Sequence, residues 1–500
     1  MKRILFLTMI SVMVLFSCTK DEIVNEKCEE ISDMEVIPAD EIRKMISDEL
    51  KRTGEFSWDN VDPVVVWSAA FHGDGIITVG FSDSPFRLQK GTSTSNARKD
   101  IIEITMSIES EGLKSALKEE DVVTYEPETL NYIDLKVSQF ATIEALNTLS
   151  GIRYIEPSGF EYFAHEMRQK SSSGCDKTVV SVYGSDYTTV NPGSLVSWVF
   201  YEHNIPQAWS VSTGSGIGVG LIDTGISDDQ SLLGSGFESG YSNNRYIAKH
   251  GVYVDSRWPW ASDTDGYHDK CGHGTLMGAT ISGPRNNQNL PLGVAYNCNL
   301  IAYRATKNVV VDGYHEKRGV GRALTELGNR NDVQIISMSI GHIFSIGSIS
   351  DAVEYAYSKG KLIIAAGGTS TSFTNWAGVI FPANMDETVA VTGIQDGVGY
   401  TECDVCHKGE KIDFTVIMER QSNTNRHSAV LGWYNGSKTY VGGSSVATAT
   451  TAGIAALIWS NHPTWNRAQV LNRMKESADF YSNRHSDFGW GTIDAYLAVQ

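Results

Sequence analysis

The 500-residue chain lacks features that define several classes of protein. Its formal net charge is −18, so the excess of positive charge typical of proteins that bind nucleic acid or anionic membranes is missing. No repeat with a period of about 20 to 50 residues is visible, which disfavours a solenoid. What is present is a globular composition, 41% hydrophobic and 20% charged, and a length that corresponds to about three domains.

The apolar stretch at the N-terminus is too short for a membrane-spanning helix. It runs from Ile4 to Phe16 behind Lys2 and Arg3, whereas a span needs about 20 residues, and this pattern is typical of a secretory signal. Its end, "LFSC", resembles a bacterial lipoprotein signal-peptidase site, which implies cleavage before Cys18 and lipidation of that residue. An ordinary cleaved signal with an incidental cysteine is the alternative. We expect an exported cell-envelope lipoprotein held by acyl chains, with the outer membrane and the cell surface as candidate locations.

The seven cysteines become an even set once Cys18 is assigned to lipid. Export permits disulfides among the other six, although spacing does not fix their connectivity. Cys403 with Cys406 and Cys271 with Cys298 are the pairs that we consider. The sequence "CDVCH", which starts at Cys403, also matches the c-type haem attachment pattern, and a redox or zinc site is a further alternative. A local disulfide is the hypothesis that we favour, and we expect no required cofactor.

The first part of the chain divides into short units. Residues 1–17 are the expected signal, and 18–97 contain an acidic tether and an α+β region with a helix that opens after Pro38. Residues 98–165 follow a βαββαβ-like pattern, and 166–197 form a linker rich in small and polar residues. The expected strands are 64–71, 75–81, 101–108, 130–138 and 152–157, and the expected helices in the βαββαβ-like unit are 111–120 and 142–150.

In residues 198–500, short continuous apolar runs alternate with helical segments. Such runs are typical of strands buried on both faces, and their alternation with helices predicts a parallel sheet with right-handed crossovers. Functional groups collect at the carboxyl ends of the strands in such sheets. The expected strands are Val219–Ile222, Leu300–Tyr303, Val333–Ile340, Leu362–Ala366 and Val389–Ile394.

Three segments in this region place a reactive side chain where that rule expects one. "VGLIDTGIS" ends a buried run in Asp223, "CGHGTLMGATISG" sets His273 between two glycines, and "GGSSVATATTAG" puts Ser445 at the start of an apolar helix. Taken singly, each has a plainer interpretation: a turn aspartate, a surface histidine and an N-cap serine. Together they supply an acid, a base and a nucleophile in the order Asp, His, Ser.

These motifs resemble those of the subtilisin-like (subtilase, S8) serine proteases, over roughly residues 198–500. The resemblance implies a three-layer α/β domain with a parallel sheet and helices on both faces, and an endopeptidase with the triad Asp223, His273 and Ser445. Residues 98–165 resemble the family's inhibitory propeptide, for which we expect a ferredoxin-like α+β fold. The implied partners are protein or peptide substrates, the chain's own propeptide, and the membrane through the lipid anchor, with no nucleic acid.

The resemblance also implies where substrate binds. "SMSIG" and "IIAAGG" resemble the two edge segments that bind the substrate backbone as an added strand. Their residues are Ser339, Ile340, Gly341, Ala365, Ala366 and Gly367. The family has an Asn as second oxyanion donor where this chain has Gly368, and Thr369, Ser370 or a backbone N–H are candidates to replace it. Ala449 stands at the family's proline, a change that we expect to be tolerated.

Three hypotheses of function follow. The first is a secreted or envelope-anchored serine endopeptidase, made as a zymogen and cut somewhere between Pro157 and Ser197. Gly368 motivates the second, a catalytically impaired pseudoprotease that acts as a surface binding protein. The third is a processing protease dedicated to one peptide precursor. The acidic cluster of Asp263, Asp265 and Asp269 has two interpretations. The resemblance leaves a structural calcium site open there, and a solvated turn without a metal is the alternative.

Overall fold

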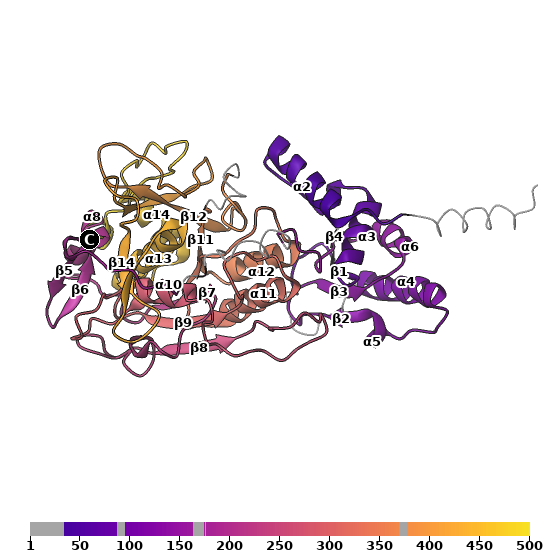
Figure 1. The fold of residues 1–500 in the computed structure, drawn as a ribbon, viewed down its shortest axis with the longest axis horizontal. Coiled ribbons are helices and arrows are strands. Elements are labelled where there is room, and N and C mark those ends of the chain that lie inside the picture. Colours follow the sequence, from indigo (N-terminus) through magenta and orange to yellow (C-terminus); the bar gives the residue numbers. More distant parts are fainter. Residues whose placement is uncertain (1–34, 88–95, 164–174, 176, 370–377) are drawn as a thin grey trace, which may run out of the picture.

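The structure is a computed structural model that describes residues 35–87, 96–163, 175, 177–369 and 378–500. The expected signal and the two cysteines Cys18 and Cys28 lie outside the described residues. Figure 1 shows a smaller N-terminal part (residues 35–163) beside a larger part (residues 177–500), which is called the peptidase part because it carries the motifs that resemble those of subtilases. The main sheet has four strands in the N-terminal part and seven in the peptidase part. Within the described ranges, no helix is long and apolar enough to cross a membrane.

The N-terminal part is an antiparallel sheet with helices on one face, in the strand order β2-β3-β1-β4. Ile133 and Leu135 of β3 join the core under these helices, whereas Tyr132 of the same strand packs into the core of the peptidase part. The elements are α2 (Ala39–Thr53), η1 (Trp58–Asn60), α3 (Pro63–His72), β1 (Ile76–Phe81), α4 (Asn96–Leu113), α5 (Glu119–Val122), β2 (Val123–Tyr125), β3 (Tyr132–Lys136), α6 (Phe140–Asn147) and β4 (Ile152–Glu156).

The segment 64–71 is helical, and the expected strand is wrong. Asp62 caps α3 by accepting the Val64 N–H (2.9 Å), and Pro63 occupies the first turn, where a helix needs no N–H donor. These start signals outweigh the β preference of the valines, which the helix buries in the core.

The segment 101–108 is helical too, in α4, where Ile101, Thr105 and Glu109 are buried at the four-residue spacing of a helix. The first strand of the βαββαβ unit is therefore β1, and the unit begins upstream of the boundary expected between residues 97 and 98. The apolar content of this segment is compatible with both a helix and a strand, and only the spacing of its buried positions distinguishes the two.

The expected helix at 111–120 is interrupted, since α4 ends at Leu113, α5 begins only at Glu119, and residues 114–118 between them are not helical. The ferredoxin-like order βαββαβ is present. The expected elements that the structure confirms are the helix after Pro38 (α2), the strands at 75–81 (β1), 130–138 (β3) and 152–157 (β4), and the helix at 142–150 (α6).

The peptidase part is built on a sheet in the order β13-β12-β11-β10-β7-β9-β8, in which every neighbouring pair is parallel. All five strands expected from the apolar runs are present. The strands are β7 (Gly218–Asp223), β8 (Ile247–Gly251), β9 (Asn299–Arg304), β10 (Ile335–Met338), β11 (Leu362–Ala366), β12 (Thr388–Gln395) and β13 (Phe414–Glu419).

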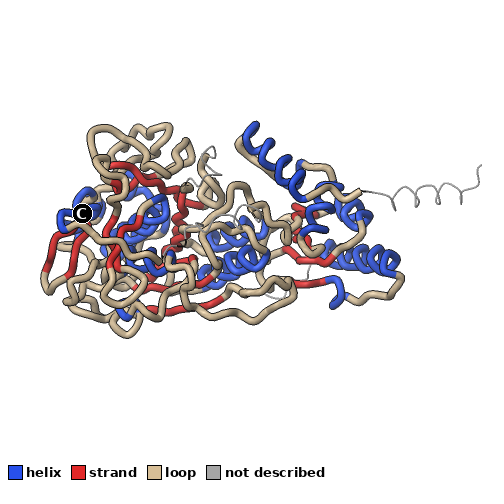
Figure 2. Tube along the Cα trace, viewed as in Figure 1, coloured by secondary structure: helices blue, strands red, loops and turns tan. Residues whose placement is uncertain are grey.

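Helices cover both faces of this sheet and form three layers (Figure 2). Successive residues of β9 divide between them: Leu300 packs in the core with α10 (His273–Ser282) and α13 (Gly443–Asn461), and Ile301 packs in the core with α11 (Tyr314–Asn329) and α12 (Gly347–Ser358). The other elements of the peptidase part are α8 (Trp198–Glu202), α9 (Ile205–Ala208), η2 (Gly184–Asp186), η3 (Ser231–Leu233), β14 (Ser428–Leu431), β15 (Lys438–Val441), α14 (Arg467–Glu476) and α15 (Ala495–Ala498).

A hairpin lies inside the segment expected as a linker, 166–197. It pairs β5 (Tyr187–Val190) with β6 (Ser194–Ser197), and Leu195 N–H donates to the Leu290 carbonyl of the peptidase part (3.0 Å). The folded peptidase part therefore starts before residue 198.

The chain order of the central strands reverses between β7 and β10, since β8 and β9 lie on one side of this pair and β11 to β13 on the other. Such a switch point opens a crevice at the carboxyl ends of the strands. Asp223 is the last residue of β7, and Ser339 directly follows β10. The topology thus brings two expected site segments to one edge.

The sheet of the N-terminal part rests on the outer helices α11 and α12 (Figure 1). Arg153 forms two hydrogen bonds to Asp351 of α12 (2.6 and 2.7 Å), and the Tyr154 hydroxyl donates to the same carboxylate (2.9 Å). The interface therefore buries specific polar pairs together with apolar surface.

Candidate active site

Asp223 and His273 meet in a buried contact. His273 Nδ1 lies 2.8 Å from Asp223 Oδ1, which also accepts the Thr224 N–H (2.8 Å). The Asp223 side chain is fully buried and His273 is 6% exposed. Burial by itself lowers the pKa of His273, but the charge and the hydrogen bond of Asp223, with a smaller contribution from Asp269, raise the pKa above its ordinary value.

The backbone ahead of His273 is fixed by Asp269, a role that sequence reasoning missed. Asp269 Oδ1 accepts the N–H groups of Cys271 (2.9 Å) and Gly272 (2.7 Å), and Oδ2 accepts both the N–H (2.9 Å) and the hydroxyl (2.6 Å) of Thr275. This carboxylate caps α10, whose first residue is His273, and so aims the imidazole. An aspartate a few residues before a helix was the available signal.

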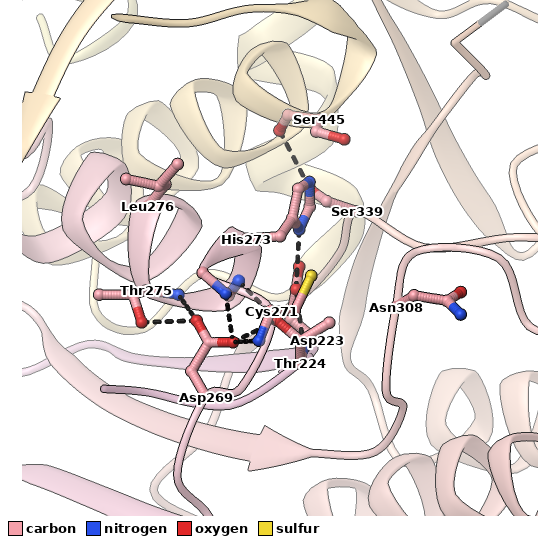
Figure 3. Close-up of polar contacts among 12 residues, drawn as sticks. Asp223, Thr224, Asp269, Cys271, His273, Thr275, Leu276, Asn308, Ser339 and Ser445 are labelled. Atoms are coloured by element: carbon pink, nitrogen blue, oxygen red, sulfur yellow. Dashed lines mark hydrogen bonds and ion pairs between the residues drawn. The ribbon is translucent and has the colours of Figure 1, made fainter. Parts of the chain in front are cut away.

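Ser445 lies in the first turn of α13, where N–H groups have no acceptor within the helix. Figure 3 shows its side chain directed at the side of the His273 ring opposite to Asp223. The Ser339 hydroxyl donates to the Ser445 carbonyl (3.0 Å), which ties the end of β10 to this turn. Ser444 is buried while Ser445 is half-buried, so the second serine is the more accessible of the two.

This geometry agrees with a family match. The subtilase family matches residues 214–491, more than half of the chain. The chain belongs to the subtilase family.

Curated relatives place this subtilase among serine-type endopeptidases. It is 30% identical over 297 residues to subtilisin NAT of Bacillus subtilis subsp. natto, with 58% of this chain and 67% of that protein covered. It is 28% identical over 332 residues to alkaline elastase YaB of Bacillus sp. (strain YaB), with 64% and 74% covered.

The fold has a solved counterpart in fervidolysin from Fervidobacterium pennivorans, a keratinolytic enzyme related to subtilisin. The TM-score is 0.59 at 17% identity, with 85% of this chain and 61% of that chain covered. At this identity the likeness shows the fold alone.

The expected substrate edges of this subtilase are partly paired with other segments. The Gly341 N–H donates to the Val309 carbonyl (3.0 Å), and the Gly341 carbonyl accepts the Val311 N–H (3.0 Å). Gly367 likewise donates to Val391 (2.8 Å) and accepts from Ile380 (3.0 Å). Gly341 and Gly367 therefore each have partners within the chain for both of their backbone groups. Of the other four residues, Ser339 adjoins Ser445 as described, while Ile340, Ala365 and Ala366 are buried.

Gly368 has no room for a side chain. Its φ is +124°, and a Cβ would lie 2.4 Å from His407 Nδ1. The Gly368 N–H points to the Ser444 hydroxyl (3.3 Å), and Thr369 is hydrogen-bonded to the hydroxyl (3.0 Å) and the N–H (3.2 Å) of Ser444. Two side chains were expected as replacements for the family's Asn. The hydroxyl of Thr369 is engaged in hydrogen bonds with Ser444, and Ser370 lies outside the described residues.

The disulfides are Cys175–Cys271 and Cys403–Cys406. The expected pairing of Cys271 with Cys298 is wrong, because Cys298 is a free thiol in the hydrophobic core, where burial raises its pKa to about 12. The disulfide within "CDVCH" is as expected, and because its two cysteines are bonded to each other, they are not free to attach haem. Nothing in the spacing pointed to Cys175.

The acidic cluster is not arranged to share a calcium ion. Asp265 pairs with Arg304 (2.8 Å) and Lys270 (2.9 Å), and Asp269 caps α10, while Asp263 is exposed. Among the described residues, no three His, Cys, Asp or Glu side chains are grouped to hold a metal.

Proposed function

We propose that this chain is an exported serine endopeptidase, made as a zymogen, whose triad is Asp223, His273 and Ser445. The observation that carries the assignment is the 2.8 Å contact between Asp223 and His273 with Ser445 directed at the opposite side of the ring (Figure 3). Family membership supplies the reaction, peptide-bond hydrolysis, and this geometry supports a role for each residue.

In the proposed mechanism, Ser445 Oγ attacks the peptide carbonyl while His273 accepts its proton. Asp223 holds Nδ1, so Nε2 is the nitrogen that exchanges protons with Ser445. The raised pKa of His273 favours the imidazolium, which then protonates the leaving amine. Water hydrolyses the acyl-enzyme by the same transfers in reverse.

The Ser445 N–H, in the first turn of α13, is the donor that we assign to the oxyanion. A side-chain donor at Gly368 is excluded by the space that His407 occupies. Loss of one oxyanion donor typically lowers the rate of a serine protease by a factor of about 10²–10³. We therefore expect a slower enzyme rather than an inactive one, which disfavours the pseudoprotease hypothesis.

The zymogen proposal rests on the N-terminal part. Its sheet covers α11 and α12, and its last described residues, Tyr162 and Phe163, donate N–H groups to Asp312 of the peptidase part. We propose that the inhibitory unit runs from β1 to at least Phe163 and is cut on its C-terminal side. Lipidation at Cys18 and location at the cell envelope are proposals that rest on the sequence "LFSC".

The test is labelling with a fluorophosphonate probe, which reacts with an activated serine. We expect the wild-type chain to be processed and labelled, and Ser445→Ala to remain unprocessed and unlabelled. Ser460→Ala, at the far end of α13, is the matched control and keeps both properties. Absence of labelling in a folded wild-type chain would contradict the triad, and identical processing of wild type and Ser445→Ala would contradict self-cleavage.

A further inference from the structure

Asp312 is a buried carboxylate for which the triad has no use. Asp312 is 1% exposed and directly follows Val311 in the chain. Oδ1 accepts the N–H of Tyr162 (2.9 Å), and Oδ2 accepts the N–H of Phe163 (2.7 Å). One carboxylate therefore holds two successive backbone groups through charge-assisted hydrogen bonds, which are the stronger kind.

His342 fixes this carboxylate from the peptidase side. Its Nδ1 lies within hydrogen-bond distance of both the carbonyl (3.2 Å) and the N–H (3.3 Å) of Phe344, and its Nε2 lies 3.4 Å from Asp312 Oδ1. Burial by itself raises the pKa of Asp312, but the hydrogen bond and charge of His342, the charge of Lys317 and the Phe163 N–H together hold that pKa below its ordinary value. The group is thus a carboxylate with one permanent partner and two partners from the N-terminal part.

The carboxylate directly follows a segment that is paired with the expected substrate edge. Ser339 is bonded to the Ser445 carbonyl, and two residues later Gly341 is paired on both backbone groups with the segment that leads into Asp312. Gly341 has no free backbone group for a substrate in this arrangement. Asp312 follows this paired segment directly, and its carboxylate accepts hydrogen bonds from the chain of the N-terminal part.

Two rings of the peptidase part stand beside this carboxylate. The ring of Phe163 lies 5.5 Å from His342, and that of Tyr162 lies 5.9 Å from Phe344, with edge-to-face orientations. His342 and Phe344 pack on each other at 4.2 Å. Edge-to-face contacts at these distances favour aromatic side chains over aliphatic ones.

We propose that Asp312, His342 and Phe344 form a subsite that selects substrates with two consecutive aromatic residues on the N-terminal side of the cut bond. The inference rests on the proposed function, because Tyr162 and Phe163 then depart with the N-terminal part and vacate the subsite. Asp312 loses two N–H donors when the N-terminal part leaves. A substrate that donates two N–H groups to Asp312 then binds more tightly than one that does not.

The test uses the processed full-length enzyme and a quenched fluorescent peptide that copies residues 156–190, with Ser in place of Cys175. A second peptide carries N-methyl groups on the two nitrogens that correspond to Tyr162 and Phe163, which removes the donors and keeps the rings. We expect N-methylation to lower kcat/KM by about tenfold or more, mainly through KM, because the contact is remote from the reacting bond. Replacement of both aromatic residues by Ala should give a separate loss of about threefold to tenfold.

Asp312→Asn should lower kcat/KM for the unmodified peptide to a similar degree and make the enzyme indifferent to N-methylation. Asp263→Asn, which removes an exposed carboxylate, is the matched control and should respond to N-methylation as the wild type does. A short acyl-tripeptide anilide without the aromatic pair should be cleaved equally by wild type and Asp263→Asn.

Equal cleavage of methylated and unmethylated peptides by the wild type would overturn the subsite, and this result does not depend on the folding of a variant. Additive losses from Asp312→Asn and N-methylation would overturn the direct contact. A cut N-terminal to the Tyr162 position, mapped by mass spectrometry, would overturn the placement of the pair. Failure to cleave even the anilide, without fluorophosphonate labelling, would refute the proposed function and this inference with it.

Discussion

In the peptidase part, the buried carboxylates of Asp223 and Asp269 accept hydrogen bonds from groups of the same part, whereas Glu156 of the N-terminal part accepts one across the interface. Glu156 receives the Gly347 N–H at the start of α12 (2.9 and 3.0 Å to its two oxygens). Burial raises the pKa of Glu156 to about 8, although the Gly347 N–H opposes this shift.

Asp134 behaves in the same way at the neighbouring helix. It accepts the Tyr314 hydroxyl at the start of α11 (2.8 Å), as well as the Thr78 hydroxyl of its own part (2.7 Å), and burial raises its pKa to about 6. The two sets of carboxylates therefore differ in what release would change. In the proposed release of the N-terminal part, the set around His273 keeps its donors, while the interface set loses the donors that the peptidase part supplies and becomes hydrated. In the zymogen that we propose, the permanent site and the inhibitor that is released thus use buried carboxylates in different ways.

The largest effect is expected at Asp223. Asp223→Asn keeps the volume but removes the charge that supports the imidazolium and the correct tautomer of His273, and kcat should fall about 10⁴-fold. Hydrolysis of the short anilide measures this, with the exposed Asp229→Asn as control. A loss of less than tenfold would mean that Asp223 serves only packing, and the contrast with Glu156 would disappear.

The second effect is on stability. Asp269→Ala leaves the loop before His273 with unsatisfied N–H groups, and the free energy of unfolding should fall by about 3 kcal/mol. Denaturant unfolding in a Ser445→Ala background measures this without self-digestion. The exposed Asp263→Asn should change it by less than about 0.5 kcal/mol. Equal stability of both variants would show that α10 does not need its cap.

The smallest effect is a pH dependence of release. The pKa of Glu156 in the assembled chain, about 8, exceeds its ordinary value of 4.5, so assembly takes up a proton. The contribution to assembly is complete below about pH 4.5 and is lost as the pH rises through about 8. Glu156→Gln mimics the protonated form, so wild type should release its N-terminal part at least severalfold faster than Glu156→Gln at pH 8, with little difference at pH 5.

The measurement is the delay before the anilide is hydrolysed, compared between the two proteins at each pH so that the titration of His273 cancels. Glu144→Gln, an exposed change on α6 of the same part, should follow the wild type. A delay that has the same pH profile in wild type and Glu156→Gln would show that the Glu156 carboxylate does not control the release.

The sequence was a reliable guide wherever a pattern is local. Five apolar runs became five strands of the parallel sheet, because a strand buried on both faces needs little besides continuous apolar residues. In the N-terminal part the same criterion failed at 64–71 and 101–108. A run of apolar residues is compatible with helix and strand alike until the partners that bury it are known.

The sequence by itself determined the fold class of the peptidase part and the three segments that carry Asp223, His273 and Ser445, because each motif lies within a few residues of a strand end or a helix start. Only the tertiary structure decided what surrounds them. The cap at Asp269, the pairing of Gly341, the partner of Cys271 and the contact of Asp312 with Tyr162 each join residues to neighbours that packing selects. Spacing along the chain fixes the first kind of feature, and the burial and hydrogen bonding of distant segments fix the second.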